Sequence, residues 1–593
     1  MFMDKNLISR LRPCLLSAGA AYITAFVLGL LLIFAGSCPD PEKLQPLSLL
    51  TNSGFQVMCL LPLPVFYGIY SRFFSQKRPI RGDALILSAF LSLFFIMGFC
   101  QNVSRSQYFA VPFFGLPGAL LQYAAALFFF YVSVVLLDEK LEGASLPAGR
   151  IGQNRSRKYL FFSGMLFLLI LWVPYLIAFF PGSLCYDARA QLMQIWGMKA
   201  FSNHNPIFDT LVYGLFYNVG AFLGRSDNAG VFAVILFQWL LLGSVLAYCA
   251  QTAYDITGRL WVRNILLLFF GLNPIFGAAV QVVLKDTFHL AVFVLYYCML
   301  LRMAALPEEK GQLPKTAVLC LLALLTRKAS LPYVVLAGVM TAWHLRKTTG
   351  KKLLTVTVGM TALFFAFENL MLPALNVEAA PSRELYSLFI QNIAYITGNH
   401  HQQLTSSELD AIDRLIGLET VLNNYDPNLA DPLKNGFTGS GSELLKLNAR
   451  LATKYPLDAL KGLLTVCWKY YFPFTGGRAY LYAYMAEVDH LGKNIFYAFP
   501  LLQKLGSLYV HGWANAPVLS LLMAPGVYSW MLLFTAGRII RKKQRYLLPL
   551  AIPLIILTLG LLLTPVNGET RYAYPVITMA PVLFLLNLCP EKP

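Results

Sequence analysis

Residues 159–180 read YLFFSGMLFLLILWVPYLIAFF, an apolar run that contains no charged side chain. About 20 such residues are needed for a helix to cross the hydrocarbon core of a bilayer, so the run predicts a transmembrane helix. Similar runs recur along the 593-residue chain, which is 57% hydrophobic and only 13% charged. Soluble proteins carry about 25% charged residues. The sequence therefore excludes a soluble multidomain enzyme, and its continuous rather than alternating runs exclude an outer-membrane barrel.

The repeated runs predict an all-α integral membrane protein with about 14 transmembrane helices. The predicted spans are Ser17–Gly36, Gln56–Phe74, Ala84–Cys100, Pro112–Leu137, Tyr159–Phe180, Gly230–Ala250, Asn264–Val282, Thr287–Leu301, Thr316–Leu325, Ser330–Trp343, Leu353–Leu372, Asn515–Ala536, Leu547–Thr564 and Ala573–Leu588. Short polar joints separate most of them. Two longer polar stretches, 181–228 and 373–514, are expected on the outer side.

Basic residues collect in alternate joints between these spans, such as RFFSQKRPIRGD, GRIGQNRSRK, RKTTGKK and GRIIRKKQR. Joints rich in Lys and Arg face the cytoplasm in most membrane proteins. Both termini are therefore expected in the cytoplasm. The net charge of +18 follows from this topology and does not require a nucleic-acid partner.

The chain is expected to divide into four parts. These are an N-terminal membrane region (1–158), a membrane core with its first outer loop at 181–228 (159–372), an extracytoplasmic helical domain (373–514) and C-terminal membrane helices (515–593). Thr405-Ser-Ser-Glu408 is a capping box that predicts a helix start in the outer domain. Pro456 is expected to separate two further helices. The aromatic residues between Trp468 and Phe474 indicate an interfacial belt or a lid.

Asp187 lies seven residues beyond the span that ends at Phe180, in the first outer loop. Such an acid is equally well explained as a helix cap or a solvated turn. The same loop carries His204 and Asn205, followed by an amphipathic helix expected along the interface. A carboxylate held there is well placed to accept a proton from a hydroxyl group.

Three further groups of charged residues interrupt apolar sequence. Lys285 and Asp286 lie between two runs, Arg327 and Lys328 lie inside another, and Glu569 and Arg571 lie near Tyr572 in the last outer turn. A solvent-exposed hairpin turn would explain Lys285 and Asp286. A salt bridge between the two residues would explain Glu569 and Arg571. Two charges in lipid would cost about 5–7 kcal/mol, so Arg327 and Lys328 predict two short helices that meet at a water-filled cavity. Basic residues there suit a lipid phosphate.

PGSLCYDARAQLMQ followed by NHNPIFDTL resembles the first outer loop of the GT-C superfamily of polyprenyl-phosphate-sugar glycosyltransferases, which includes the protein O-mannosyltransferases. The blocks VVLKDTFH, LLTRKASLPYVV and ETRYAYP are similar to an uncharacterised family of bacterial multi-pass proteins near that superfamily. The resemblance implies a GT-C-like core in a bacterial plasma membrane. It implies Asp187 as general base, and Arg571 and Tyr572 facing the lipid phosphate.

The chain departs from that superfamily at two points. Ala188 follows Asp187 where many members have a second acid, and His204-Asn205-Pro206 replaces His-Pro-Pro. A divalent metal usually needs more than one carboxylate, so a metal cofactor is possible but not required.

The resulting hypothesis is a transferase that moves a sugar from a polyprenyl-phosphate donor to a hydroxyl on a glycan, lipid or protein acceptor of the cell envelope. Asp187 would be catalytic, with Arg571, Tyr572, Arg327, Lys328 and Lys285 at the donor phosphate. His204, Asn205, Asp286 and Glu569 would support the site or contact the acceptor. The alternatives are a transporter or flippase of a lipid-linked glycan and a non-catalytic envelope protein on the same fold.

Overall fold

The computed structural model describes residues 12–25, 27, 60–103, 115–143, 156–307, 309, 311–474 and 483–589. The chain divides into two compact units. Unit 1 comprises Met1–Leu146 with Tyr471–Thr475, and unit 2 comprises Pro147–Tyr470 with Gly476–Pro593. Residues 17–25 and 27 of the predicted span Ser17–Gly36 are helical, and the rest of that span lies outside the described residues.

Besides a helical stretch at residues 12–25, the described part of unit 1 contains three labelled helices. They are α4 (Leu63–Phe74), α5 (Gly82–Val103) and α6 (Gly115–Gly143). Two salt bridges join the segment before α5 to the end of α6, Arg81–Asp138 at 2.6 Å and Arg78–Glu139 at 2.7 Å. Basic residues of the joint predicted to face the cytoplasm are thus paired with acids of the neighbouring helix.

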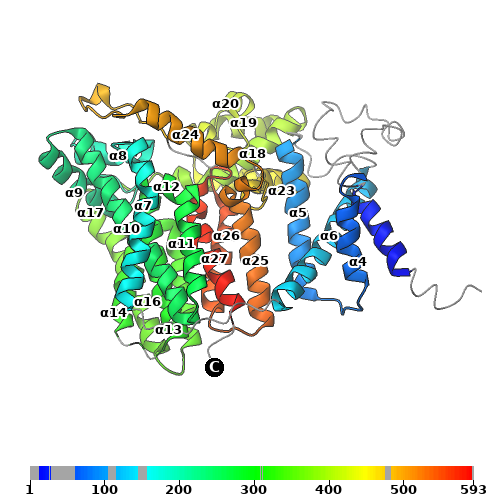
Figure 1. Ribbon diagram of the computed structural model, residues 1–593. Helices are drawn as coiled ribbons and strands as arrows, with labels where there is room; N and C mark the ends of the chain where they lie inside the picture. The colour runs from blue at the N-terminus through cyan, green and yellow to red at the C-terminus, as the bar shows by residue number, and fades with distance from the viewer. Residues whose placement is uncertain are drawn as a thin grey trace, which may run out of the picture. The chain divides into compact units, whose positions relative to one another are not determined.

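Unit 2 is a helical bundle whose long helices run side by side (Figure 1). They are α7 (Arg157–Ala178), α9 (Ile207–Gly224), α10 (Asp227–Thr257), α11 (Leu260–Leu272), α13 (Lys285–Ala305), α14 (Gln312–Thr326), α15 (Leu331–His344), α16 (Gly350–Ala366), α25 (Pro525–Arg541), α26 (Leu548–Gly560) and α27 (Tyr574–Leu588). The short helices α12 (Pro274–Val280) and α17 (Leu372–Ala374) follow α11 and α16. Almost every residue of α13 and α27 is buried, so these two helices lie inside the bundle.

Eight helices of the described residues are long and apolar enough to cross a membrane, and nine if one bent pair counts as a single span. Two shorter apolar helices, Gln312–Thr326 and Leu548–Leu563, accompany them. The chain is therefore an all-α, multi-pass membrane protein. One of the eight is α9, which was expected to lie along the interface; its 18 residues are long and apolar enough to span instead.

Two interruptions break the bundle helices. Helices α11 and α12 are bent by 58° at a break between Leu272 and Pro274, where the Asn273 side chain accepts a hydrogen bond from the Ile275 amide. Helix α14 ends at Thr326, Arg327 is extended, and a 3-10 turn, Lys328–Ser330, leads into α15. The predicted pair of short helices meeting at Arg327 and Lys328 is confirmed.

A group of short helices lies over one end of the bundle in Figure 1. It contains α18 (Ser387–His400), α19 (Ser406–Leu415), α20 (Leu418–Asn424), α21 (Asp431–Lys434), α22 (Gly441–Lys454) and α23 (Pro456–Thr465). The predicted capping box is confirmed, since Thr405 Oγ1 accepts from the Glu408 amide and the Glu408 carboxylate accepts from the Thr405 amide. The predicted helix break at Pro456 is also confirmed. Helix α24 (Pro500–Asn515) runs across the same end.

Most of the aromatic cluster is buried rather than exposed as a belt, although Phe474 at its end is 50% exposed. Trp468, Tyr470, Tyr471 and Phe472 are each at most 5% exposed. The hydroxyl of Tyr470 donates a hydrogen bond to the Val566 carbonyl at 2.8 Å. An amphipathic ring suits a buried site with one hydrogen-bond partner as well as it suits the headgroup zone.

Candidate functional site

The site begins with two very short parallel strands. Strand β1 (Ser183–Leu184) pairs with β2 (Val282–Val283), with Ser183 opposite Val282. A helix follows each strand after one linking residue, α8 (Tyr186–Ile195) after β1 and α13 after β2. Asp187 and Asp286 are therefore both the second residue of a helix, and the strand register brings the two helix starts together. An acid in the first turn is stabilised by the helix dipole.

Buried polar side chains hold β2 and the start of α13 in place. Gln238 of α10 donates through Nε2 to the Val282 carbonyl at 2.8 Å and accepts from the Leu284 amide at 3.2 Å. The Tyr213 hydroxyl lies 2.7 Å from Gln238 Oε1 and 2.8 Å from the Leu284 carbonyl. A satisfied network of this kind in a low-dielectric interior fixes geometry. Lys285 and Asp286 thus project from a rigid start of α13.

Asp187 forms salt bridges with two cations. Its Oδ2 lies 2.9 Å from Arg571 Nη1 and 3.3 Å from Lys285 Nζ. Lys285 also donates to the side chain of Asn205, whose own amide donates to the Asp187 carbonyl at 3.4 Å. Residues from the first outer loop, the start of α13 and the turn before α27 therefore meet around one carboxylate.

Asp286 links two arginines. It is only 2% exposed, pairs with Arg327, and its Oδ2 lies 3.5 Å from Arg571 Nη1. The guanidinium groups of Arg327 and Arg571 lie 5.2 Å and 5.3 Å from the ring centre of Tyr572. Glu569 Oε1 is 3.4 Å from Arg571 Nε. The orientation of Arg571 is thus set by two acids and one aromatic ring in addition to Asp187.

We call the six charged residues Asp187, Lys285, Asp286, Arg327, Glu569 and Arg571 the acid–base cluster. It contains three cations and three anions, so its formal charge is zero. Burial disfavours the charged form of Asp187, but the nearby charges of Lys285 and Arg571 outweigh it and hold the pKa of this carboxyl well below its ordinary value. Asp187 is consequently ionised at neutral pH and, while both pairs persist, a weak base.

The other predicted residues lie beside the cluster. Lys328 pairs with Glu368 at 2.9 Å, and Asn203 donates to the same carboxylate at 2.8 Å. His204 is exposed and forms no hydrogen bond with a described residue. Sequence reasoning missed Glu368, although an acid in the apolar run FFAFENLML is a recognisable signal.

Asp209 is a second residue that sequence reasoning missed. It belongs to α9, is fully buried, and neither carboxyl oxygen has a hydrogen-bond partner among the described residues. Its position in NPIFDTL, three residues after Pro206, is typical of the first turn of a helix. Asp209 therefore did not stand out as a charged residue inside an apolar run.

The carboxylates of the cluster do not suit a divalent metal. Each of the three is paired with Lys or Arg, whereas Mg²⁺ and Ca²⁺ need free oxygen ligands. Within the described residues, no group of three or more His, Cys, Asp or Glu side chains is arranged to hold a metal ion.

The fold and the cluster define a multi-pass helical membrane protein with a charged site at one end of its bundle. The chain belongs to DUF6020, a family of unknown function whose model matches residues 197–592. Lys285, Asp286, Arg327 and Arg571 lie inside the match, and Asp187 lies ten residues before it. No curated protein and no solved structure matches the chain.

Proposed function

We propose that this protein is a GT-C-type glycosyltransferase that moves a sugar from a polyprenyl-phosphate donor to a hydroxyl acceptor on the outer face of the membrane. The proposal includes a GT-C-like core, about 14 spans and cytoplasmic termini in a bacterial plasma membrane. The resemblance of the loop around Asp187 to that superfamily suggests the reaction. The geometry of the acid–base cluster supplies the structural support.

The single observation that carries the proposal is the placement of Asp187 between Arg571 and Lys285, at 2.9 Å and 3.3 Å. A transferase of this kind needs a carboxylate for the acceptor proton and cations for the leaving phosphate, within a few ångströms of each other. This chain draws these groups from three distant segments. Their convergence supports a common role.

In the proposed reaction the acceptor hydroxyl gives its proton to Asp187 while its oxygen bonds to the anomeric carbon of the sugar. The bond from that carbon to the donor phosphate breaks, and its electron pair leaves with the polyprenyl phosphate. Arg571 and Lys285 offset the charge that develops on this leaving group. Attack opposite the leaving group inverts the anomeric configuration.

Donor binding also changes Asp187. A phosphate that takes hydrogen bonds from Arg571 and Lys285 competes with the carboxylate for the same donors. As these pairs weaken, the pKa of Asp187 rises toward its ordinary value and the residue becomes a stronger base. The free enzyme thus keeps a weak base, which is strengthened when the donor is present.

The remaining predicted residues act through these groups. Arg327 is paired with the buried Asp286 and, across Tyr572, helps to orient Arg571. Asn205 positions Lys285, and Glu569 holds the Arg571 side chain. Lys328, which pairs with Glu368, is proposed to contact the donor phosphate, and the exposed His204 to contact the acceptor or support the site.

The test compares Asp187→Asn with Asp410→Asn, a matched change at an exposed acid of α19. Glycan profiling of the envelope of a deletion strain first identifies the missing sugar. Transfer of that sugar is then measured in membranes with equal amounts of each variant. Loss of a general base lowers the rate by about 10²–10⁴-fold, whereas Asp410→Asn leaves it unchanged.

Unchanged transfer in Asp187→Asn would show that Asp187 is not the base. A reconstituted protein that moves labelled lipid across vesicles but transfers no sugar would favour the flippase alternative.

A further inference from the structure

A second site lies at the opposite end of the bundle. It is a pocket of about 390 Å³ lined by the last residues of α10, α13 and α15, the segment after α25, and Cys589 after α27. Helix α13 starts at Lys285 in the acid–base cluster and reaches this pocket at Ala305. A helix of that length spans about 30 Å, which is the thickness of the hydrocarbon core of a bilayer. The two sites therefore lie at opposite membrane interfaces.

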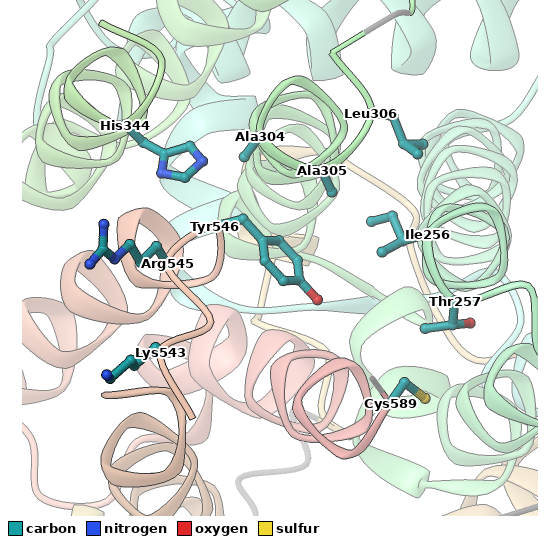
Figure 2. A pocket seen from close by; sticks show the side chains of 10 residues that line it. All are labelled: Ile256, Thr257, Ala304, Ala305, Leu306, His344, Lys543, Arg545, Tyr546 and Cys589. Carbon is teal, nitrogen blue, oxygen red and sulfur yellow. The ribbon is translucent and has the colours of Figure 1, made fainter. Parts of the chain in front are cut away.

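Basic residues dominate the polar lining. Lys543, Arg545 and His344 line the pocket, and none of its other lining residues in the described part of the chain is acidic. Figure 2 shows Tyr546 in the middle, with these three side chains on one side of it and Ile256, Thr257 and Cys589 on the other. Among the described residues, no carboxylate forms a salt bridge with Lys543 or Arg545. We call this site the basic pocket.

Lys543 adopts a backbone conformation that normally selects glycine. Its φ is +57°, and it follows Lys542, the C-cap of α25. The Lys543 amide donates to the Ile540 carbonyl and the Gln544 amide to the Ile539 carbonyl, which is the Schellman arrangement. Glycine is the usual residue at this position because a side chain is strained there. The lysine at this position places a positive charge just after the C-terminus of α25, at the pocket.

The carbonyl groups at nearby helix ends do not account for these cations. Gln544 Nε2 donates to the Asn587 and Cys589 carbonyls at 3.4 Å and 3.3 Å, which satisfies the end of α27. At the end of α13, the Arg302 carbonyl accepts from the Leu306 amide at 2.7 Å. Lys543 and Arg545 are thus not needed as hydrogen-bond donors to these carbonyls.

We propose that the basic pocket binds the phosphate group of an anionic phospholipid from the adjacent leaflet. Lys543 and Arg545 would supply the charge, and the apolar side of the pocket a contact for the glycerol backbone. Phosphodiester headgroups lie at the depth of this pocket, and basic residues at such an interface attract anionic lipids. The ligand chemistry is a phosphate anion, and free phosphate is the alternative source. This site is independent of the proposed sugar transfer.

The experiment uses the purified full chain in detergent. Binding of dihexanoyl phosphatidylglycerol, dihexanoyl phosphatidylcholine and inorganic phosphate is measured separately by native mass spectrometry and by titration. The variants are Lys543→Gly, Arg545→Gln and their combination. The matched control is Lys347→Gln with Lys351→Gln, which removes two charges near the end of α15 that do not line the pocket.

We expect phosphatidylglycerol to bind more tightly than phosphatidylcholine. Each single variant should weaken that binding by about fivefold and the combination by about 25-fold, as expected for one interfacial cation each. The control should bind like the original protein. Since Lys543→Gly relieves backbone strain, weaker binding by this variant cannot be attributed to misfolding.

Inorganic phosphate that binds as tightly as phosphatidylglycerol, with the same loss in the variants, would keep the anion site but overturn the lipid as its ligand. Equal binding of both lipids, or phosphatidylglycerol binding that survives the double variant, would overturn the site itself.

Discussion

The two ends of the bundle differ in whether their charged side chains have partners of opposite charge. In the acid–base cluster, each of the six charged side chains has an opposite charge within 4 Å. In the basic pocket, neither Lys543 nor Arg545 has a carboxylate partner among the described residues. An anion that enters the cluster must displace Asp187, whereas one that enters the pocket only adds to it. An anion that binds at the acid–base cluster therefore replaces an existing salt bridge, whereas an anion that binds in the basic pocket replaces none.

The largest expected effect comes from removing Arg571, where the donor phosphate is proposed to replace the Asp187 carboxylate. The change Arg571→Gln removes the cation that Asp187 and the proposed phosphate share, and transfer should fall by about 10²–10³-fold. Kinetics with varied donor and varied acceptor should place most of the loss on donor use. Arg450→Gln, at an exposed arginine of α22, is the control. A loss confined to the acceptor would contradict the role assigned to Arg571.

The next effect is on stability and concerns Asp286. Asp286→Asn leaves Arg327 and Arg571 without their buried partner, which should lower the free energy of unfolding by about 3–5 kcal/mol. Asp431→Asn breaks the pair with Lys434, in which the acid is 48% exposed, and should cost less than about 1 kcal/mol. Thermal unfolding in detergent measures both. Equal losses would mean that Asp286 is not a buried anchor of the cluster.

A smaller effect is the pH dependence of stability that Asp187 contributes. Because the pKa of Asp187 is lower in the folded protein, its pairing stabilises the fold fully above the unfolded value of about 3.9. This stabilisation is lost as the pH falls from there toward the lowered value. Acidification should therefore lower the melting temperature of the original protein more than that of Asp187→Asn. Parallel melting curves of the two proteins between neutral and acid pH would refute the pairing.

The smallest effect concerns the backbone of the basic pocket. Lys543→Gly should raise the free energy of unfolding by about 1 kcal/mol, because glycine adopts a positive φ without strain. The neighbouring Lys542 has a φ of −76°, so Lys542→Gly should bring no such gain. The same unfolding assay compares the two variants. A destabilising Lys543→Gly would show that the side chain supports the fold rather than a ligand.

The residues of the cluster could be predicted from sequence because charge is rare in apolar runs. Lys285, Asp286, Arg327 and Arg571 stand out for this reason alone, and the cost of burying Arg327 and Lys328 predicts the break between α14 and α15. Their partners could not be predicted. Arg327 pairs with Asp286, and Arg571 reaches both Asp187 and Asp286. These contacts depend on helix packing, which the hydropathy of single segments does not encode.

The pairing of β1 with β2 could not be predicted from the sequence either. Each strand has two residues, too few to show an alternating pattern. Residues 181–228 read as a polar outer loop because Asp187, His204 and Asn205 interrupt them. Helix α9 within that stretch is nevertheless apolar enough to span. The aromatic residues near Tyr470 were assigned to an interface because side chains of the same composition serve in both environments.

The wide separation of the cluster residues along the chain also sets an order of assembly during synthesis. Asp286 and Arg327 are 41 positions apart, whereas Asp187 and Arg571 are 384 apart. A chain made from its N-terminus can join the first pair early, but Asp187 must wait for the segment that begins α27. Until that last helix inserts, the growing chain carries an acid at this site without its arginine. A chain that stops short of Arg571 would leave Asp187 with Lys285 as its one cationic partner in the cluster.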